Sequence, residues 1–186
     1  LAYRLASPGR PDRTVTVVRA ADGGWRVDVP GGALGGGADV AVVSHGEELY
    51  HCVVGLGPHC VQVTELSAEH DPMVQHVFTD WLEVLTERTA PLAVSEAAPL
   101  DGVAGTCFSV ESSTASLVAP VDPGIYCFGA DGVLTGARLS FGTLTLAGGP
   151  QPAPDSVELP GPVVAGTPLP TASPIPQPSA PPPTGG

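Results

Sequence analysis

Four cysteines are the feature that most constrains the fold of this 186-residue chain, which contains neither lysine nor asparagine. Their number is even, no Cys-x-x-Cys motif is present, and Cys52, Cys60, Cys107 and Cys127 lie in segments typical of strands and tight turns. Such cysteines usually form disulfides in proteins that work outside the reducing cytoplasm. The sequence therefore predicts the disulfides Cys52–Cys60 and Cys107–Cys127, and an extracytoplasmic protein that is secreted or anchored to the cell surface.

A zinc site is the alternative for the pairs His51-Cys52 and His59-Cys60. Adjacent residues of a strand point to opposite faces of a sheet, so His51 and Cys52 cannot both reach one ion unless the strand breaks. Zinc fingers also pair their ligands across short turns, which this spacing does not provide. We therefore expect no metal and no cofactor.

The acidity of the chain limits its partners. Nineteen aspartates and glutamates outnumber seven arginines, which gives a formal net charge of −12. A surface of this charge repels phosphate backbones, and no basic stripe compensates for it locally. We expect neither nucleic acid nor anionic membrane surfaces among the partners.

The first residues of the chain suggest that an upstream segment has been cleaved off. The first residue is Leu1 rather than Met, and residues 2–5 already resemble a strand. We expect that an upstream signal peptide, lipoprotein signal or membrane anchor has been removed. No run of about 18 apolar residues is present, so the sequence predicts no transmembrane segment, and we expect a lipoprotein-like monomer.

No catalytic motif marks the chain as an enzyme. The G-x-S-x-G motif of serine hydrolases is missing, and the five histidines lie outside recognisable motifs. The acidic pairs at 47–48 and at 83 and 87 are typical of solvated surfaces rather than of a glycosidase site. We therefore expect a non-enzymatic protein without catalytic residues, with a hydrolase as the third option.

Most of the chain alternates between apolar and polar residues, the period of half-buried strands. The expected strands cover residues 13–20, 25–29, 39–44, 48–54 and 60–64, and then 92–96, 106–111, 115–118, 124–128, 133–140 and 143–147. Residues 39–44 are apolar on both faces, which predicts a central, covered strand. The glycine-rich residues 31–37 are expected to form a mobile loop.

One segment has the period of a helix. Asp71 is the expected N-cap and Pro72 occupies the first turn, where its missing N–H group costs nothing. Apolar side chains then recur every three or four residues, at Val74, Val77, Phe78, Trp81, Leu82 and Leu85. The sequence thus predicts one α+β domain with a single curved antiparallel sheet over one main amphipathic helix.

The composition changes near residue 148. Thirteen of the 22 prolines lie from Pro150 onward, and proline-rich chain cannot bury enough apolar area to offset its ordering entropy. We expect a β-rich domain over residues 1–147, an extended segment over 148–164 that docks on the domain, and a disordered tail over 165–186.

This order of elements resembles the LolA/LppX/RseB-like half-barrel of extracytoplasmic bacterial proteins. The resemblance covers residues 1–147 and is carried by the strands at 14–19, 25–29 and 40–44. The hairpin at 126–134, Tyr-Cys-Phe-Gly-Ala-Asp-Gly-Val-Leu, looks like one in small secreted or lipid-anchored proteins of GC-rich Gram-positive bacteria. The resemblance implies an antiparallel half-barrel around helices, with an apolar cavity that carries or senses acylated molecules.

Two functions remain open at this point. The aromatic helix face either lines a cavity for a lipid or another apolar ligand, or fills the core of a structural, interaction or sensor domain of the cell envelope. The residues expected to line the cavity are Trp25, Val27, Phe78 and Trp81. A cavity of a few hundred Å³ at these residues favours the first function, and a solid core favours the second.

Overall fold

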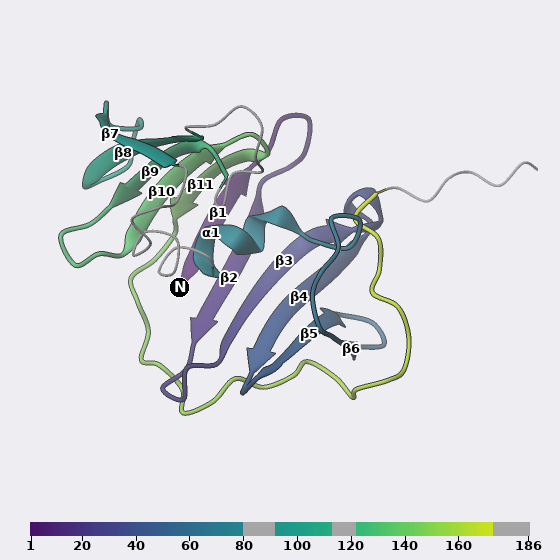
Figure 1. Ribbon diagram of the computed structural model, residues 1–186. Helices are drawn as coiled ribbons and strands as arrows, with labels where there is room; N and C mark the ends of the chain where they lie inside the picture. Colours follow the sequence, from purple (N-terminus) through teal and green to yellow (C-terminus); the bar gives the residue numbers. More distant parts are fainter. Residues whose placement is uncertain (80–91, 113–121, 173–186) are drawn as a thin grey trace, which may run out of the picture.

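The computed structural model describes residues 1–79, 92–112 and 122–172 (Figure 1). Its strands form one sheet with the order β6-β5-β4-β3-β2-β1-β11-β10-β9-β8-β7, and every neighbouring pair of strands is antiparallel. The strands are β1 (Ala2–Ala6), β2 (Arg13–Arg19), β3 (Trp25–Ala33), β4 (Ala38–His45), β5 (Glu48–Val53), β6 (His59–Val63), β7 (Leu92–Ala97), β8 (Thr106–Ser112), β9 (Gly124–Phe128), β10 (Leu134–Leu139) and β11 (Gly142–Leu146). The expected strand at 115–118 lies outside the described residues.

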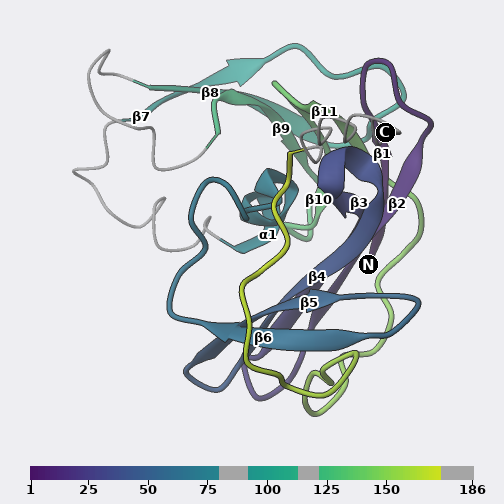
Figure 2. The same ribbon diagram turned by 90° about the vertical axis from the view of Figure 1, so that its right-hand side faces the viewer.

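The sheet consists of two meanders joined along one seam. Strands β1 to β6 form the first meander and strands β7 to β11 the second, and β1 pairs with β11 between them. Figure 2 shows that the sheet bends strongly, so that its concave side surrounds the short helix α1 (His76–Thr79). The expected single curved antiparallel sheet, similar to a half-barrel, is therefore confirmed.

Strand β4 shows how the sheet acquires a core on both faces. Residues 40–43 are all buried, as their apolar sequence predicts. Val40 packs into the main concave core, whereas Ala41 and Val43 belong to a second cluster on the other face. Since successive side chains of a strand point to opposite faces, a continuous apolar run needs cover on both sides.

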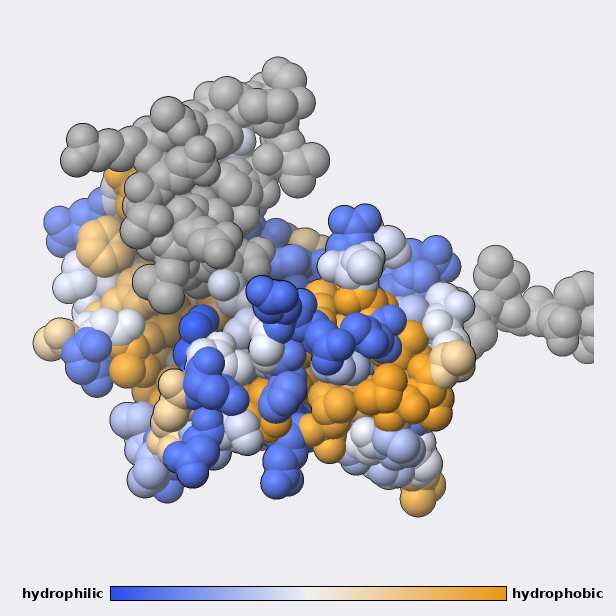
Figure 3. All heavy atoms as spheres, turned by 60° about the horizontal axis from the view of Figure 1, so that its bottom comes forward, coloured by the Kyte–Doolittle hydropathy of each residue, from blue (hydrophilic) through white to orange (hydrophobic). Residues whose placement is uncertain are grey.

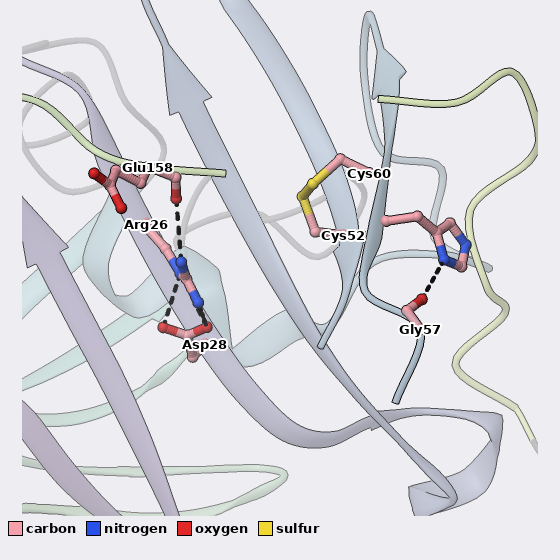
Figure 4. The surroundings of a disulfide bond; sticks show 7 residues. Arg26, Asp28, Cys52, Gly57, Cys60 and Glu158 are labelled. Atoms are coloured by element: carbon pink, nitrogen blue, oxygen red, sulfur yellow. Dashed lines mark hydrogen bonds and ion pairs between the residues drawn. A yellow bond between two sulfur atoms is a disulfide. The ribbon is translucent and has the colours of Figure 1, made fainter. Parts of the chain in front are cut away.

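Both predicted disulfides are present, and both join residues that face each other directly across two strands. Cys52 of β5 pairs with Cys60 of β6, and Cys107 of β8 pairs with Cys127 of β9. The Cα–Cα distances are 4.0 Å and 3.9 Å, close to the spacing of antiparallel residue pairs that exchange no backbone hydrogen bonds. In such pairs the backbone N–H and C=O groups point away from the disulfide partner. Figure 4 shows the first disulfide, between Cys52 and Cys60.

The helical segment begins differently from the prediction. A 3-10 turn, η2 (Met73–Gln75), precedes α1, and its N-cap is Pro72 without a side-chain hydrogen bond. The expected N-cap, Asp71, accepts hydrogen bonds instead from the His76 ring and, at 3.4 Å, from the Gln75 amide. The Asp71 carboxylate, which would have to accept from backbone N–H groups to cap the helix, thus binds two side chains instead. The continuation with Trp81, Leu82 and Leu85 lies outside the described residues, so a main amphipathic helix stays a prediction.

The glycine-rich stretch at 31–37 was expected to be a mobile loop, and the structure gives it defined partners. Strand β3 continues to Ala33, and the 3-10 turn η1 (Leu34–Gly36) follows. The N–H groups of Leu34 and Gly35 donate to the carbonyl groups of Pro170 and Thr171, each at 2.8 Å. These partners are far away in the sequence, so local composition could not reveal them.

Residues 150–172, which we call the strap, wrap around the β6 edge of the sheet (Figures 1 and 2). Val157 packs into the core cluster on the convex face. Cys60 at the edge donates its N–H group to Pro162 at 2.9 Å and accepts from Val164 at 2.8 Å. Leu169 then packs against the concave core.

The strap extends past the expected start of the tail at residue 165. Thr171 donates its N–H group to the Glu69 carbonyl at 2.8 Å, and its hydroxyl donates to the same oxygen at 3.0 Å. The composition argument considered apolar area alone, whereas backbone hydrogen bonds hold residues 165–172. The remaining tail, residues 173–186, lies outside the described residues.

Candidate functional site

Three of the four predicted ligand-binding residues belong to the concave core. Val27 is fully buried there, Trp25 packs at its margin, and Phe78 is buried with its ring centroid 4.8 Å from that of Tyr3. Trp81 lies outside the described residues. Phe78 of α1 and Val27 of β3 thus belong to one buried cluster, and the role of these residues in ligand binding stays a prediction.

A cleft lies beside this core. This cleft of about 400 Å³, open to solvent, lies between the β1–β2 connection, the end of β3 and the segment that leads into η2. Phe141 of the β10–β11 turn and Thr171 of the strap complete its wall. Trp25, Val27 and Phe78 do not line it. The cleft thus combines the ends of β1, β2 and β3 with turns and with the strap, which strand periodicity alone does not bring together.

The inner wall of the cleft is apolar. Leu5 of β1, Val29 of β3 and Val74 of η2 line it, and all three are buried. Phe141 is partly buried and packs against the same core. Met73 lies at the cleft with 47% of its surface exposed. The cleft can therefore accept apolar groups without losing hydrogen bonds.

Hydrophobic residues also reach the outside of the molecule. The large side chains concerned, among the described residues, are Leu56, Met73, Val94, Val163 and Val164. Figure 3 shows a face on which patches of hydrophobic residues alternate with hydrophilic ones. Only Met73 of this group contributes to the cleft.

Arg13 lies in the cleft wall with its guanidinium held by neutral acceptors. Its Nη1 donates to the carbonyl groups of Pro30 at 3.0 Å and Gly31 at 3.3 Å, and its Nη2 donates to the Ser7 hydroxyl at 3.1 Å. Its Nε is buried and has no partner among the described residues. Burial, and then the nearby charge of Arg10, lower the pKa of Arg13, while Asp39 opposes this shift.

Arg10 is the second cation of the cleft. Its side chain is exposed and makes no hydrogen bond or ion pair with any residue in the described part of the chain. A Cβ atom on Gly36, where φ is +106°, would lie only 3.3 Å from the Arg10 Nη1 atom. Glycine at position 36 thus permits both the left-handed turn and the close approach of the guanidinium.

The carboxylates near the cleft already have partners. Asp71 lines the cleft and accepts hydrogen bonds from His76 and Gln75. Asp39 accepts from the Gly31 N–H group at 2.7 Å. Two arginines and one aspartate therefore give the cleft lining a formal charge of +1, in a chain whose net charge is −12.

A further buried polar group lies on β5, outside the cleft lining. His51 of β5 is 2% exposed, and its Nε2 atom has no partner among the described residues. Burial and then the nearby His70 lower the pKa of His51 to about 4. The described residues contain no cluster of three or more histidines, cysteines or carboxylates that could hold a metal ion.

The fold and the cleft define the class of protein: an antiparallel half-barrel with two cross-strand disulfides and an open cleft of mixed polarity. No protein-family model, curated protein or solved structure matches this chain. In the part of the chain that the structure describes, no helix is long and apolar enough to cross a membrane. The resemblance to the LolA/LppX/RseB-like half-barrel stays a prediction.

Proposed function

We propose that the chain is a non-enzymatic, extracytoplasmic binding module for a lipid or another ligand with a large apolar part. The observation that carries this proposal is the cleft of about 400 Å³ with Leu5, Val29 and Val74 in its wall. Small-molecule sites typically occupy about 300–1,000 Å³ and combine apolar walls with a few polar groups. The two disulfides support the extracytoplasmic location, because such bonds persist in oxidising compartments.

The proposed ligand position differs from the one inferred from the helix pattern. The cleft uses the outer end of the concave face, whereas Val27 and Phe78 fill the core beside it. A ligand can therefore bind without opening that core.

A structural or interaction domain of the envelope is the second candidate function. The observation that favours it is the packing of Tyr3, Val27 and Phe78 in one buried cluster, where the half-barrel resemblance implied a cavity. In that case the cleft is a surface feature without a small-molecule ligand.

A neutral apolar dye separates the two functions. Titration of the full, oxidised chain with N-phenyl-1-naphthylamine should give saturable fluorescence enhancement if the cleft binds apolar ligands. Ala68 is exposed at the cleft, so Ala68→Trp should obstruct it with little effect on the core and weaken binding at least about tenfold, which is about 1.4 kcal/mol.

Ala130→Trp is the matched control, because Ala130 is exposed in the β9–β10 turn away from the cleft lining. It should bind the dye as the wild type does. Absence of saturable binding by the wild type, or equal loss in both variants, would contradict a ligand site in the cleft and leave the structural domain.

A further inference from the structure

Two other arginines of the sheet, Arg4 and Arg26, have carboxylate partners, whereas the two arginines of the cleft have none among the described residues. The Arg26 Nη2 atom lies 2.6 Å from the Asp28 carboxylate, and the Arg4 Nη1 atom lies 3.4 Å from that of Asp12. Arg13 instead donates to two carbonyl groups and a hydroxyl. Neutral acceptors fix the position of a guanidinium without neutralising its charge, so the charge stays available to an incoming anion.

The two cleft cations also lie close enough to influence each other. The charge of Arg10 contributes to the lowered pKa of Arg13, and Asp39 offsets this only in part. A Cβ atom on Gly31 would lie 3.2 Å from the Arg13 Nη1 atom, as one on Gly36 would crowd Arg10. Two guanidinium groups are therefore packed onto a glycine backbone at one end of the cleft, and an anion placed there would relieve their mutual repulsion.

The apolar wall is part of the same cleft. Leu5, Val29 and Val74 line it together with Arg10 and Arg13. A small inorganic anion would leave this wall in contact with water, whereas an amphiphile would satisfy both parts. The cleft thus combines one cationic group of residues with one apolar surface.

We propose that Arg10 and Arg13 bind the anionic head group of an amphiphile, a carboxylate or phosphate monoester, whose apolar tail lies on the Leu5, Val29 and Val74 wall. This inference rests on the proposed function, because it requires that the cleft holds a ligand. It adds the class of head group and the two residues that recognise it. Guanidinium groups suit this role because their N–H donors match the oxygen geometry of both anions.

Displacement of the neutral dye by ligands with equal tails tests the head group. Decanoate, monodecyl phosphate and 1-decanol are added below their micelle concentrations to the dye-loaded full chain. The wild type should bind at least one anion about tenfold or more tightly than the alcohol, since charge-assisted hydrogen bonds are stronger than neutral ones. Comparison of the two anions identifies the head group.

Arginine variants locate the recognition. Arg10→Gln should reduce the preference for the anion about threefold to tenfold, and Arg10→Gln combined with Arg13→Gln should remove it while the alcohol still binds. Arg10 is exposed, so its variant keeps the test valid even if Arg13→Gln disturbs the fold. Arg138→Gln is the matched control, because Arg138 is exposed on β10 outside the cleft lining and its loss should change nothing.

The outcomes separate this inference from the proposed function. Equal binding of anion and alcohol by the wild type, or an unchanged preference in Arg10→Gln and in the double variant, overturns the role of the arginines and leaves an apolar ligand site. Failure of the dye itself to bind overturns the proposed function, and the head-group inference with it.

Discussion

The two meanders of the sheet secure their outer strands in different ways. Each carries a cross-strand disulfide, β5–β6 in the first meander and β8–β9 in the second. In the first, Cys60 lies in the edge strand and exchanges backbone hydrogen bonds with the strap. In the second, Cys107 lies in β8, one strand inside the edge, where it faces Ala97 of the edge strand β7. The four middle residues of β7 are exposed. The Cys52–Cys60 disulfide thus holds an edge strand that the strap covers. The Cys107–Cys127 disulfide holds β8, the strand next to an edge strand with exposed side chains.

This difference between the two edges shows that sequence periodicity predicts where strands lie, but not which segments cover them. Open sheet edges are surfaces on which another strand can pair, and proteins usually protect them. The strap protects β6 and also adds Val157 to the convex core of the first meander. Stability in that meander should therefore depend on both the disulfide and the strap.

Loss of the side chain that connects the two meanders should have the largest effect. Tyr3 of β1 is buried, and its hydroxyl donates to the Leu134 carbonyl of β10 at 2.9 Å. Tyr3→Ala should lower the free energy of unfolding by about 3–5 kcal/mol in urea denaturation, as for other large buried aromatics. Tyr3→Phe keeps the ring, so it should lose only about 1–3 kcal/mol for the unpaired carbonyl. Equal losses in the two variants would show that the ring contributes nothing.

Removal of the disulfides compares the meanders directly. The sequence separations are 20 residues for Cys107–Cys127 and 8 for Cys52–Cys60. Chain entropy predicts a loss of about 3 kcal/mol for Cys107→Ala/Cys127→Ala, and about 1 kcal/mol less for Cys52→Ala/Cys60→Ala. Urea denaturation of both double variants measures the difference. The reverse order would mean that docking of the strap depends on the disulfide at Cys60.

Acid should weaken the first meander through His51. Its pKa in the folded protein is lowered to about 4, below the ordinary value of 6.5, so the unfolded chain binds a proton more readily. Stability therefore falls as the pH drops from about 6.5 toward about 4, by roughly 2 kcal/mol at about pH 5. His51→Gln should show a smaller loss over the same range in thermal unfolding. An identical pH dependence in wild type and variant would assign the effect to other groups.

Leu169 of the strap should have a smaller effect. Its side chain is partly buried against the concave core. Leu169→Ala should cost about 1–2 kcal/mol, less than for a fully buried leucine, and lower the melting temperature by several degrees. Val164→Ala is the control, because Val164 is 41% exposed and its loss should stay within about 0.5 kcal/mol. Similar melting temperatures for wild type and Leu169→Ala would show that the strap is not coupled to folding.

Much of the sheet and both disulfides could be predicted from the sequence because their signals are local. Alternating apolar residues marked strands, and the buried run at 40–43 marked a strand covered on both faces. The cysteine pairs were predicted from the even number of cysteines and their position in strand segments, and Cys52 and Cys60 lie in consecutive strands joined by a short connection. These features need only the residues within each element and the turn that follows it.

The cleft could not be predicted in the same way. Arg10 and Arg13 lie in and after a turn that reads as a simple connection, and Thr171 comes from proline-rich chain. One signal was present: two of the seven arginines of an acidic chain occur within four residues. Their meaning depends on Gly36 and on the apolar wall, which only the folded chain brings to them.

The seam between β1 and β11 determines the order in which the fold can close. Tyr3 pairs with Leu146, and 146 minus 3 is a separation of 143 residues. The hairpins from β2 to β6 can form from neighbouring chain as it emerges during synthesis, but the outer edge of β1 has no partner until β11 follows. Contacts between such distant residues form slowly, and an unpaired strand edge is a template for association with other chains. Misassembly is therefore most probable in the interval before β11 emerges.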